Sequence, residues 1–105
     1  MTNPSKFQGG IIAGGSVDPA GALLAGGVGA ITARTGLGVY TITLNEECPA
    51  GECLLFVASG LLGGADITAS ISHVSNTVKT VELFDAGVAA DARFDFMIIR
   101  LFDGY

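Results

Sequence analysis

The stretch RFDFMIIRLF, residues 93–102, decides the fold class, because it has the composition of a β-strand but is apolar on both faces. Side chains alternate between the two faces of a strand, and a half-buried antiparallel strand alternates apolar with polar residues. This strand therefore either lies between two layers or turns its outer face to a partner chain. A small sandwich has no third layer of its own, so the pattern favours a partner. The residues predicted for this oligomer interface are Phe94, Phe96, Met97, Ile98 and Ile99.

Upstream of this strand, short runs of β-branched and aromatic residues are separated by turn signals roughly every ten residues. The turn TGLG joins the first two runs into a hairpin, and DAGVAAD (85–91) forms a longer loop. No stretch has the period of a helix. We therefore expect an all-β fold, an antiparallel β-sandwich of jelly-roll-like character with about seven strands, over residues 28–105. The predicted strands are residues 28–34, 39–44, 53–59, 67–74, 77–84 and 93–102.

Residues 1–27 differ from the rest, because eight of the sixteen glycines lie within the first 29 residues. Glycine makes ordering costly, so this segment would be flexible on its own. It also carries aliphatic side chains that a simple linker would not need. We expect an extended N-terminal arm that orders against a neighbouring subunit or surface, with an ordinary loop and a short first strand as the alternative. The residues predicted to anchor the arm are Ile11, Ile12, Leu23 and Leu24.

The composition indicates a chain whose surface is covered by other protein. Its 105 residues suit one domain with one modest core. Hydrophobic residues make up 50% of the chain and charged residues only 14%, against about 25% charged residues in ordinary soluble domains. Lysine occurs only at Lys6 and Lys79, and interface cores are depleted in lysine. We therefore expect the chain to assemble with copies of itself and with other proteins.

The charge and the hydropathy pattern argue against two further classes of partner. With a net charge of −5 and five scattered basic residues, the chain has no patch that could neutralise the phosphates of a nucleic acid. No apolar run is long enough to span a membrane, and the N-terminus lacks the basic and apolar regions of a secretory signal. We expect neither nucleic acid binding nor a membrane span.

The acidic turn NEECPAGEC, residues 45–53, holds both cysteines, Cys48 and Cys53. Three neighbouring glutamates disfavour thiolates, and the pair supplies only two of the four ligands that a zinc or iron–sulfur site needs. Pro49 and Gly51 suit the second and fourth positions of a type I turn. The cysteines would then face each other where two strands leave the turn, either joined in a disulfide or left as free thiols.

Three further groups of residues suggest chemistry, but none has a complete signature. His73 lies among serines, yet a serine nucleophile also needs an orienting acid and an oxyanion hole. Asp85, Asp91 and Asp95 lack the spacing of an EF-hand calcium loop. The glycines of SGLLGGAD (59–66) are only loosely similar to a phosphate-binding loop. We therefore expect a protein that is not an enzyme and that uses no metal and no cofactor.

Two patterns together resemble the small β-sandwich domains of bacteriophage fibre, spike and head-decoration proteins. They are the hairpin ARTGLGVYTITL and the late pair of strands in TVELFDAGVAADARFDFMIIR, and the match covers about residues 30–102. The chain departs from long fibres in having no shaft repeat or coiled coil. The residues that carry the resemblance are Arg34, Gly36, Gly38, Tyr40, Thr41 and Thr43 in the first pattern, and Phe84, Asp85, Gly87, Asp91, Phe94 and Phe96 in the second.

The resemblance implies a structural protein at the surface of a virus particle: a capsid decoration, minor capsid, spike or head-fibre component. Such domains usually assemble as homotrimers around a three-fold axis, and here the arm would attach the trimer to a capsid or other virion protein. The alternative is a fibre-tip module that recognises a host-surface glycan or protein through loops at residues 60–66 or 85–91. A cellular trimeric domain of C1q-like character also remains compatible with the composition.

Overall fold

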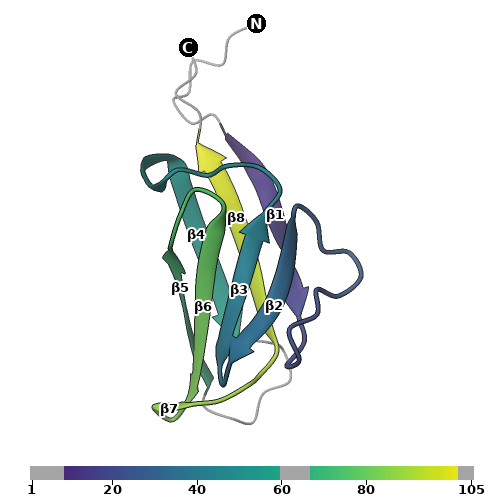
Figure 1. The fold of residues 1–105 in the computed structure, drawn as a ribbon, viewed down its shortest axis with the longest axis vertical. Coiled ribbons are helices and arrows are strands. Elements are labelled where there is room, and N and C mark those ends of the chain that lie inside the picture. The colour runs from purple at the N-terminus through teal and green to yellow at the C-terminus, as the bar shows by residue number, and fades with distance from the viewer. Residues whose placement is uncertain (1–8, 60–66, 102–105) are drawn as a thin grey trace, which may run out of the picture.

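The chain folds into two antiparallel β-sheets packed face to face, and Figure 1 shows them as two layers. The structure is a computed structural model that describes residues 9–59 and 67–101. The three-stranded sheet has the order β1-β8-β4, and the five-stranded sheet has the order β2-β3-β6-β5 with β7 paired to β6. The first sheet contains β1 (Gly9–Val17), β4 (Cys53–Ser59) and β8 (Phe94–Leu101). The second contains β2 (Ala30–Gly36), β3 (Val39–Leu44), β5 (Ile67–His73), β6 (Val78–Asp85) and β7 (Val88–Ala89).

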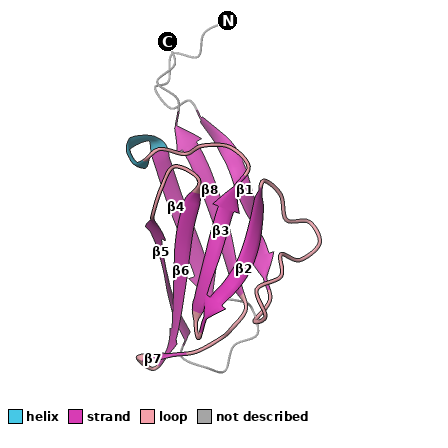
Figure 2. Cartoon of the chain, viewed as in Figure 1, coloured by secondary structure: helices cyan, strands magenta, loops and turns pink. Residues whose placement is uncertain are grey.

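Strands make up most of the described chain, and Figure 2 shows one short helical turn, η1 (Ala50–Glu52), before β4. The predicted all-β class and antiparallel sandwich are therefore confirmed. The structure has eight strands among the described residues, against about seven predicted. Two of them lie outside the predicted strands: β1 lies in the presumed arm, where a short first strand was the alternative, and the two-residue β7 lies in the 85–91 loop.

The core lies between the sheets because each strand turns every second side chain inward. From the five-stranded sheet it receives mainly residues of β3 and β6, and from the three-stranded sheet residues of β1 and β8. Tyr40 and Phe94 meet across the layers edge to face, with ring centroids 5.0 Å apart. The buried core residues are Ala13, Val17, Tyr40, Ile42, Leu44, Cys48, Val81, Leu83, Phe94, Phe96 and Ile98.

Residues 9–27 belong to the sandwich, which corrects the predicted arm and its boundary at residue 27. β1 pairs with β8 along its whole length, from Gly9 opposite Leu101 to Val17 opposite Phe94. The following segment is tied back to β1, since Gly14 and Val28 exchange both backbone hydrogen bonds. Residues 1–8 of the predicted arm lie outside the described residues.

The glycines of this segment permit tight turns, which is why composition alone suggested a flexible arm. Gly21 and Gly29 have φ angles of 99° and 81°, in the left-handed region that favours glycine. A Cβ on Gly29 would lie 2.0 Å from the carbonyl oxygen of Ile12. The carboxylate of Asp18 accepts hydrogen bonds from the backbone N–H groups of Ala20 and Ala22, both at 2.9 Å. The loop is therefore held by specific contacts within the chain.

The β2–β3 hairpin explains several residues of the glycine-rich turn pattern. Gly38 has a φ of 70°, and a Cβ there would lie 2.6 Å from the carbonyl oxygen of Leu83. Its backbone N–H donates to Asp91 Oδ1 at 2.7 Å, and Arg34 Nε donates to Asp91 Oδ2 at 2.8 Å. The Tyr40 hydroxyl donates to the carbonyl oxygen of Pro19 at 2.8 Å. These residues therefore connect the hairpin to the segment before β8 and to the loop after β1.

Candidate interaction surface

The outer face of the three-stranded sheet, which points away from the core, has large apolar side chains on all three strands, with Ser16 and Asp95 in the row beyond them. The register places Ile11 of β1 and Leu54 of β4 on either side of Ile99 of β8. In the next row on the same face, Met97 lies between Gly14 and Phe56. We call Ile11, Leu54, Phe56, Met97 and Ile99 the outer apolar face.

The outer apolar face remains exposed in the single chain, although its residues are large and hydrophobic. Ile11 is 62% exposed, Phe56 46% and Leu54 37%, and Met97 and Ile99 are half-buried. Single exposed apolar residues are common on protein surfaces, but a contiguous group over three neighbouring strands makes this face a candidate binding surface. This group is the strongest candidate for a functional surface among the described residues.

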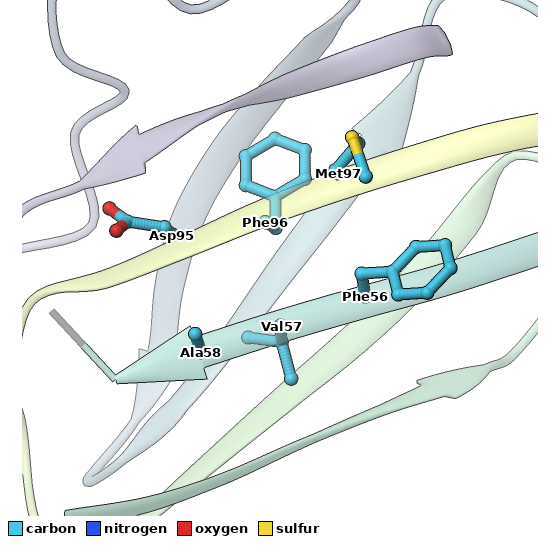
Figure 3. Close-up of a pocket in the computed structure, with 6 residues that line it drawn as sticks. All are labelled: Phe56, Val57, Ala58, Asp95, Phe96 and Met97. Atoms are coloured by element: carbon cyan, nitrogen blue, oxygen red, sulfur yellow. The ribbon is translucent and has the colours of Figure 1, made fainter. Parts of the chain in front are cut away.

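A hollow lies beside this face, between β4 and β8. It is lined by Phe56, Val57 and Ala58 of β4 and by Asp95, Phe96 and Met97 of β8, and Figure 3 shows these residues on the two adjacent strands. Asp95 is the only charged residue of its lining, and its carboxylate accepts a hydrogen bond from the Ser16 hydroxyl. The hollow is therefore suited to an apolar group more than to an ionic ligand.

The predicted oligomer interface is corrected by this arrangement. Phe94, Phe96 and Ile98 are buried in the core of the same chain, so they are not available to a partner. Met97 and Ile99 do lie on the outer face. The prediction failed because β8 is the central strand of its sheet. One of its faces is apolar because it lines the core of the same chain, and the other is part of the outer apolar face. The sequence analysis missed Leu54 and Phe56, although CLLFVAS is also apolar at both alternating sets of positions.

The four predicted arm anchors are divided between the core and the surface. Ile12 and Leu23 pack against the core of their own chain, which corrects their assignment as anchors to another protein. Leu24 is half-buried, and its backbone N–H donates to the carbonyl oxygen of Ser16 at 2.8 Å. Ile11 alone of the four is largely exposed, as part of the outer apolar face.

The acidic turn closes one end of the sandwich, and its two cysteines form a disulfide with their Cα atoms 5.4 Å apart. Cys48 is buried, and its backbone N–H donates to the carbonyl oxygen of Asn76 at 2.7 Å. Arg100 donates to Glu52 Oε1 from Nη2 at 3.0 Å and to the carbonyl oxygen of Glu47 from Nη1 at 2.9 Å. The turn is thus fixed to both sheets, and its residues serve structure.

Lys79 is a buried cation on the inner face of β6, and the sequence analysis did not predict its role. Its side chain is 0% exposed, and Nζ donates to the carbonyl oxygens of Cys48 and Ser75 at 2.9 and 2.7 Å. The third contact is with His73 Nδ1 at 2.8 Å. Burial lowers the pKa of Lys79 below its ordinary value of 10.5. The alternation of β6 was the available signal, since Lys79 has the same parity as the core residues Val81 and Leu83.

The other polar candidates are held in separate structural contacts. Asp91 is bound by Arg34 and by the backbone of Gly38, and the hydrogen bond from Arg34 is the main reason that the pKa of Asp91 is lowered. Asp95 contacts Ser16, and His73 contacts Lys79. Within residues 9–59 and 67–101, no group of three His, Cys, Asp or Glu side chains is placed to hold a metal ion. The glycines of the 59–66 segment from Gly60 onward lie outside the described residues.

Comparisons of the chain with known protein families, with curated proteins and with solved structures found no significant match. The described part of the chain contains no helix that is long and apolar enough to cross a membrane.

Proposed function

We propose that this chain is a non-enzymatic structural subunit that assembles with protein partners through its outer apolar face. The observation that carries the proposal is the register of Ile11, Ile99 and Leu54 beside that of Met97 and Phe56, which makes one continuous apolar surface. The low content of charged residues, 14% of the chain, supports a surface that is covered in the working state.

The size of the face limits how much of the assembly it can support alone. Three strands about 4.8 Å apart and seven residues of about 3.4 Å each give the whole outer side of the three-stranded sheet roughly 14 by 24 Å, or roughly 350 Å², and this is the upper limit for the outer apolar face. A standard interface covers about 800 Å² per partner. At about 25 cal/mol per Å² of apolar surface on each of two partners, the face supplies at most about 17 kcal/mol, of which association consumes about 4–15 kcal/mol. The area is less than half of that standard, which favours a further contact in a stable assembly.

The setting that we propose is the surface of a virus particle, with the chain as a decoration, minor capsid, spike or head-fibre component. The support is the resemblance of the hairpin around Gly38 and of the late strand pair to phage sandwich domains. The same resemblance supports a homotrimer and a jelly-roll-like connection of the strands. A capsid or other virion protein is the partner that this setting implies.

The proposed function is tested by the mass of the purified protein in solution. Light scattering over a concentration series is expected to show an oligomer, about three chains in the proposed arrangement. Met97→Lys places a charge in the centre of the outer apolar face and is expected to shift the protein toward the monomer. Thr43→Lys is the matched control, because Thr43 is exposed on the outer face of the other sheet. A wild-type monomer at every concentration, or equal effects of both variants, would refute the proposal.

A further inference from the structure

The two sides of the sandwich are protected to different extents. On one side, the outer edge of β1 is bridged to Val28 and to the loop that follows β1. In addition, β1 and β2 each carry a register shift. On the opposite side, β4 and β5 lie at the ends of their sheets; they lie close to each other across the two layers, but no strand pairing joins them. β4 pairs with β8 over seven residues without a register shift. Natural edge strands usually carry bulges, prolines or inward charges that prevent pairing with another chain, and β4 has none of these devices.

The backbone of β4 offers unused hydrogen-bonding groups. In an antiparallel pair, the N–H and C=O groups of alternate residues point away from the neighbouring strand. Among the described residues, β8 is the one strand that is hydrogen-bonded to β4. The sequence of β4, CLLFVAS, has no charge and no proline and is rich in residues that favour strands. These features together favour the addition of a further strand at this edge.

We infer that β4 pairs antiparallel with β4 of a second copy of this chain, so that the two three-stranded sheets become one six-stranded sheet. The inference rests on the proposed function in one respect, because it takes a second copy of this chain as a partner. A two-fold contact cannot lie within a three-fold trimer, so these β4 pairs would join one trimer to the next. The other open edge, β5, fits such a role less well, since its outer positions are Thr68, Ser70 and Ser72 and its pairing would not extend the apolar surface.

The sequence of β4 sets the register of this pairing. Residues that lie opposite each other in a sheet must point to the same face, so the two-fold axis must pass through a residue and not between two residues. An axis at Phe56 is the one choice that pairs all seven residues of the strand. It places Leu54 opposite Ala58, Leu55 opposite Val57 and Phe56 opposite its own copy, so every pair except the terminal one is apolar.

The edge contact supplies what the outer apolar face lacks. Pairing of β4 with its copy joins the outer sides of two three-stranded sheets, and with them two outer apolar faces, into one surface of roughly 700 Å². A face contact and an edge contact with different symmetry also let one chain build an extended shell, because a single two-fold contact closes after two copies. Two distinct self-contacts therefore agree with the role of a structural subunit.

Amide hydrogen exchange of β4 tests the inference directly. In concentrated wild-type protein, every second amide in residues 53–59 is expected to exchange at least about tenfold more slowly than in dilute protein. Met97→Lys weakens the face contact but should retain this protection. Leu54→Lys, at the proposed edge, should remove it, whereas Ser70→Lys on β5 is the matched control and should leave it unchanged.

Each result of this experiment decides between the two proposals. If oligomers form while the β4 amides exchange equally fast at all concentrations, the edge inference is wrong and the proposed function stands. If Ser70→Lys abolishes the protection and Leu54→Lys does not, the pairing uses β5 and the inference is again wrong. If neither oligomers nor protection appear at any concentration, both the inference and the proposed function are overturned.

Discussion

The two sheets of this sandwich share one core but present opposite surfaces to their surroundings. The outer face of the five-stranded sheet is rich in hydroxyl groups, with Thr41 of β3 and Thr80 of β6 directly opposite each other and Ser72 of β5 next in the row. The corresponding row of the three-stranded sheet contains Met97 and Phe56. Threonine and serine fit a strand face that is exposed to water, whereas Met97 and Phe56 are apolar side chains of the kind that is usually buried. This difference is the reason that we place the proposed interaction surface on the three-stranded sheet.

The inner faces of the two sheets also differ in polarity, and the five-stranded sheet is again the more polar one. The three-stranded sheet turns Val17, Phe94, Phe96 and Ile98 toward the core. The five-stranded sheet has one buried cation, Lys79, among its inward residues. Because its ammonium group binds backbone carbonyls of the acidic turn and of the β5–β6 turn, it holds the end of the sandwich together. The sheet that is polar outside is thus also the one that uses a buried polar contact.

Deleting residues 1–27 should have the largest effect, because it removes one of the three strands that make the outer apolar face. The deletion exposes the whole β1 edge of β8 and takes Ala13 and Val17 out of the core. We expect the cooperative unfolding transition in urea to be lost. If the shortened chain unfolds cooperatively near the wild-type midpoint, β1 is dispensable and the outer face consists of β4 and β8 alone.

Lys79→Met should cause the next largest loss and would test the polar contact of the five-stranded sheet. The variant has a similar volume but leaves the carbonyl oxygens of Cys48 and Ser75 without their donor. Each unsatisfied buried group costs about 1–3 kcal/mol, partly offset because no charge is buried any longer. We expect a decrease of about 2–4 kcal/mol in the free energy of unfolding near neutral pH, with Thr80→Val on the outer face of β6 as a control that changes little.

The pH dependence of the same pair of proteins gives a second measurement. Because burial lowers the pKa of Lys79 from 10.5, the unfolded chain binds this proton more strongly than the folded chain. The stability contribution of Lys79 should therefore increase as pH rises from its lowered pKa to about 10.5. The difference in the free energy of unfolding between wild type and Lys79→Met should therefore increase over that pH interval. A constant difference would show that the ammonium group is not desolvated.

The disulfide should contribute a smaller amount, and it connects the two sheets that are compared. Cys48 follows β3 of the five-stranded sheet, and Cys53 begins β4 of the three-stranded sheet. Closing so short a loop gives about 2 kcal/mol in the chain-entropy model. We expect the urea midpoint to fall by the corresponding amount in reductant, with a mass increase of about two hydrogens. An unchanged midpoint after complete reduction would show that the contacts of Lys79 and Arg100 suffice to fix the turn.

The sequence predicted the strands well, because their residues alternate with a period of two and end at turn residues. The predicted run 67–74 became β5 at Ile67–His73, and 77–84 became β6 at Val78–Asp85. The N-terminal segment could not be predicted in the same way. Its glycines serve close contacts with distant residues, such as Gly29 against Ile12, and composition does not distinguish such contacts from flexibility.

The outer apolar face could be predicted only in part. The apolar pattern of β8 singled out Met97 and Ile99, which lie on the outer apolar face, but a strand apolar on both faces does not reveal which face is the core. That choice depends on Ile11 and Leu54, which the register brings beside Ile99 from positions distant in the chain. Pairing between strands that are far apart in sequence is the information that a single sequence lacks.

Asp91→Asn should have the smallest effect and extends the comparison to acid conditions. The hydrogen bond from Arg34 is the main cause of the lowered pKa of Asp91, followed by that from the backbone of Gly38. Because the folded chain binds this proton less strongly than the unfolded chain, the stabilisation is present above 3.8 and decreases as pH falls below it. Urea midpoints at about pH 5 and about pH 3 should differ less in Asp91→Asn than in wild type. Equal differences would show that the Arg34–Asp91 pair, which lies at the partly exposed hairpin of the five-stranded sheet, adds no stability there.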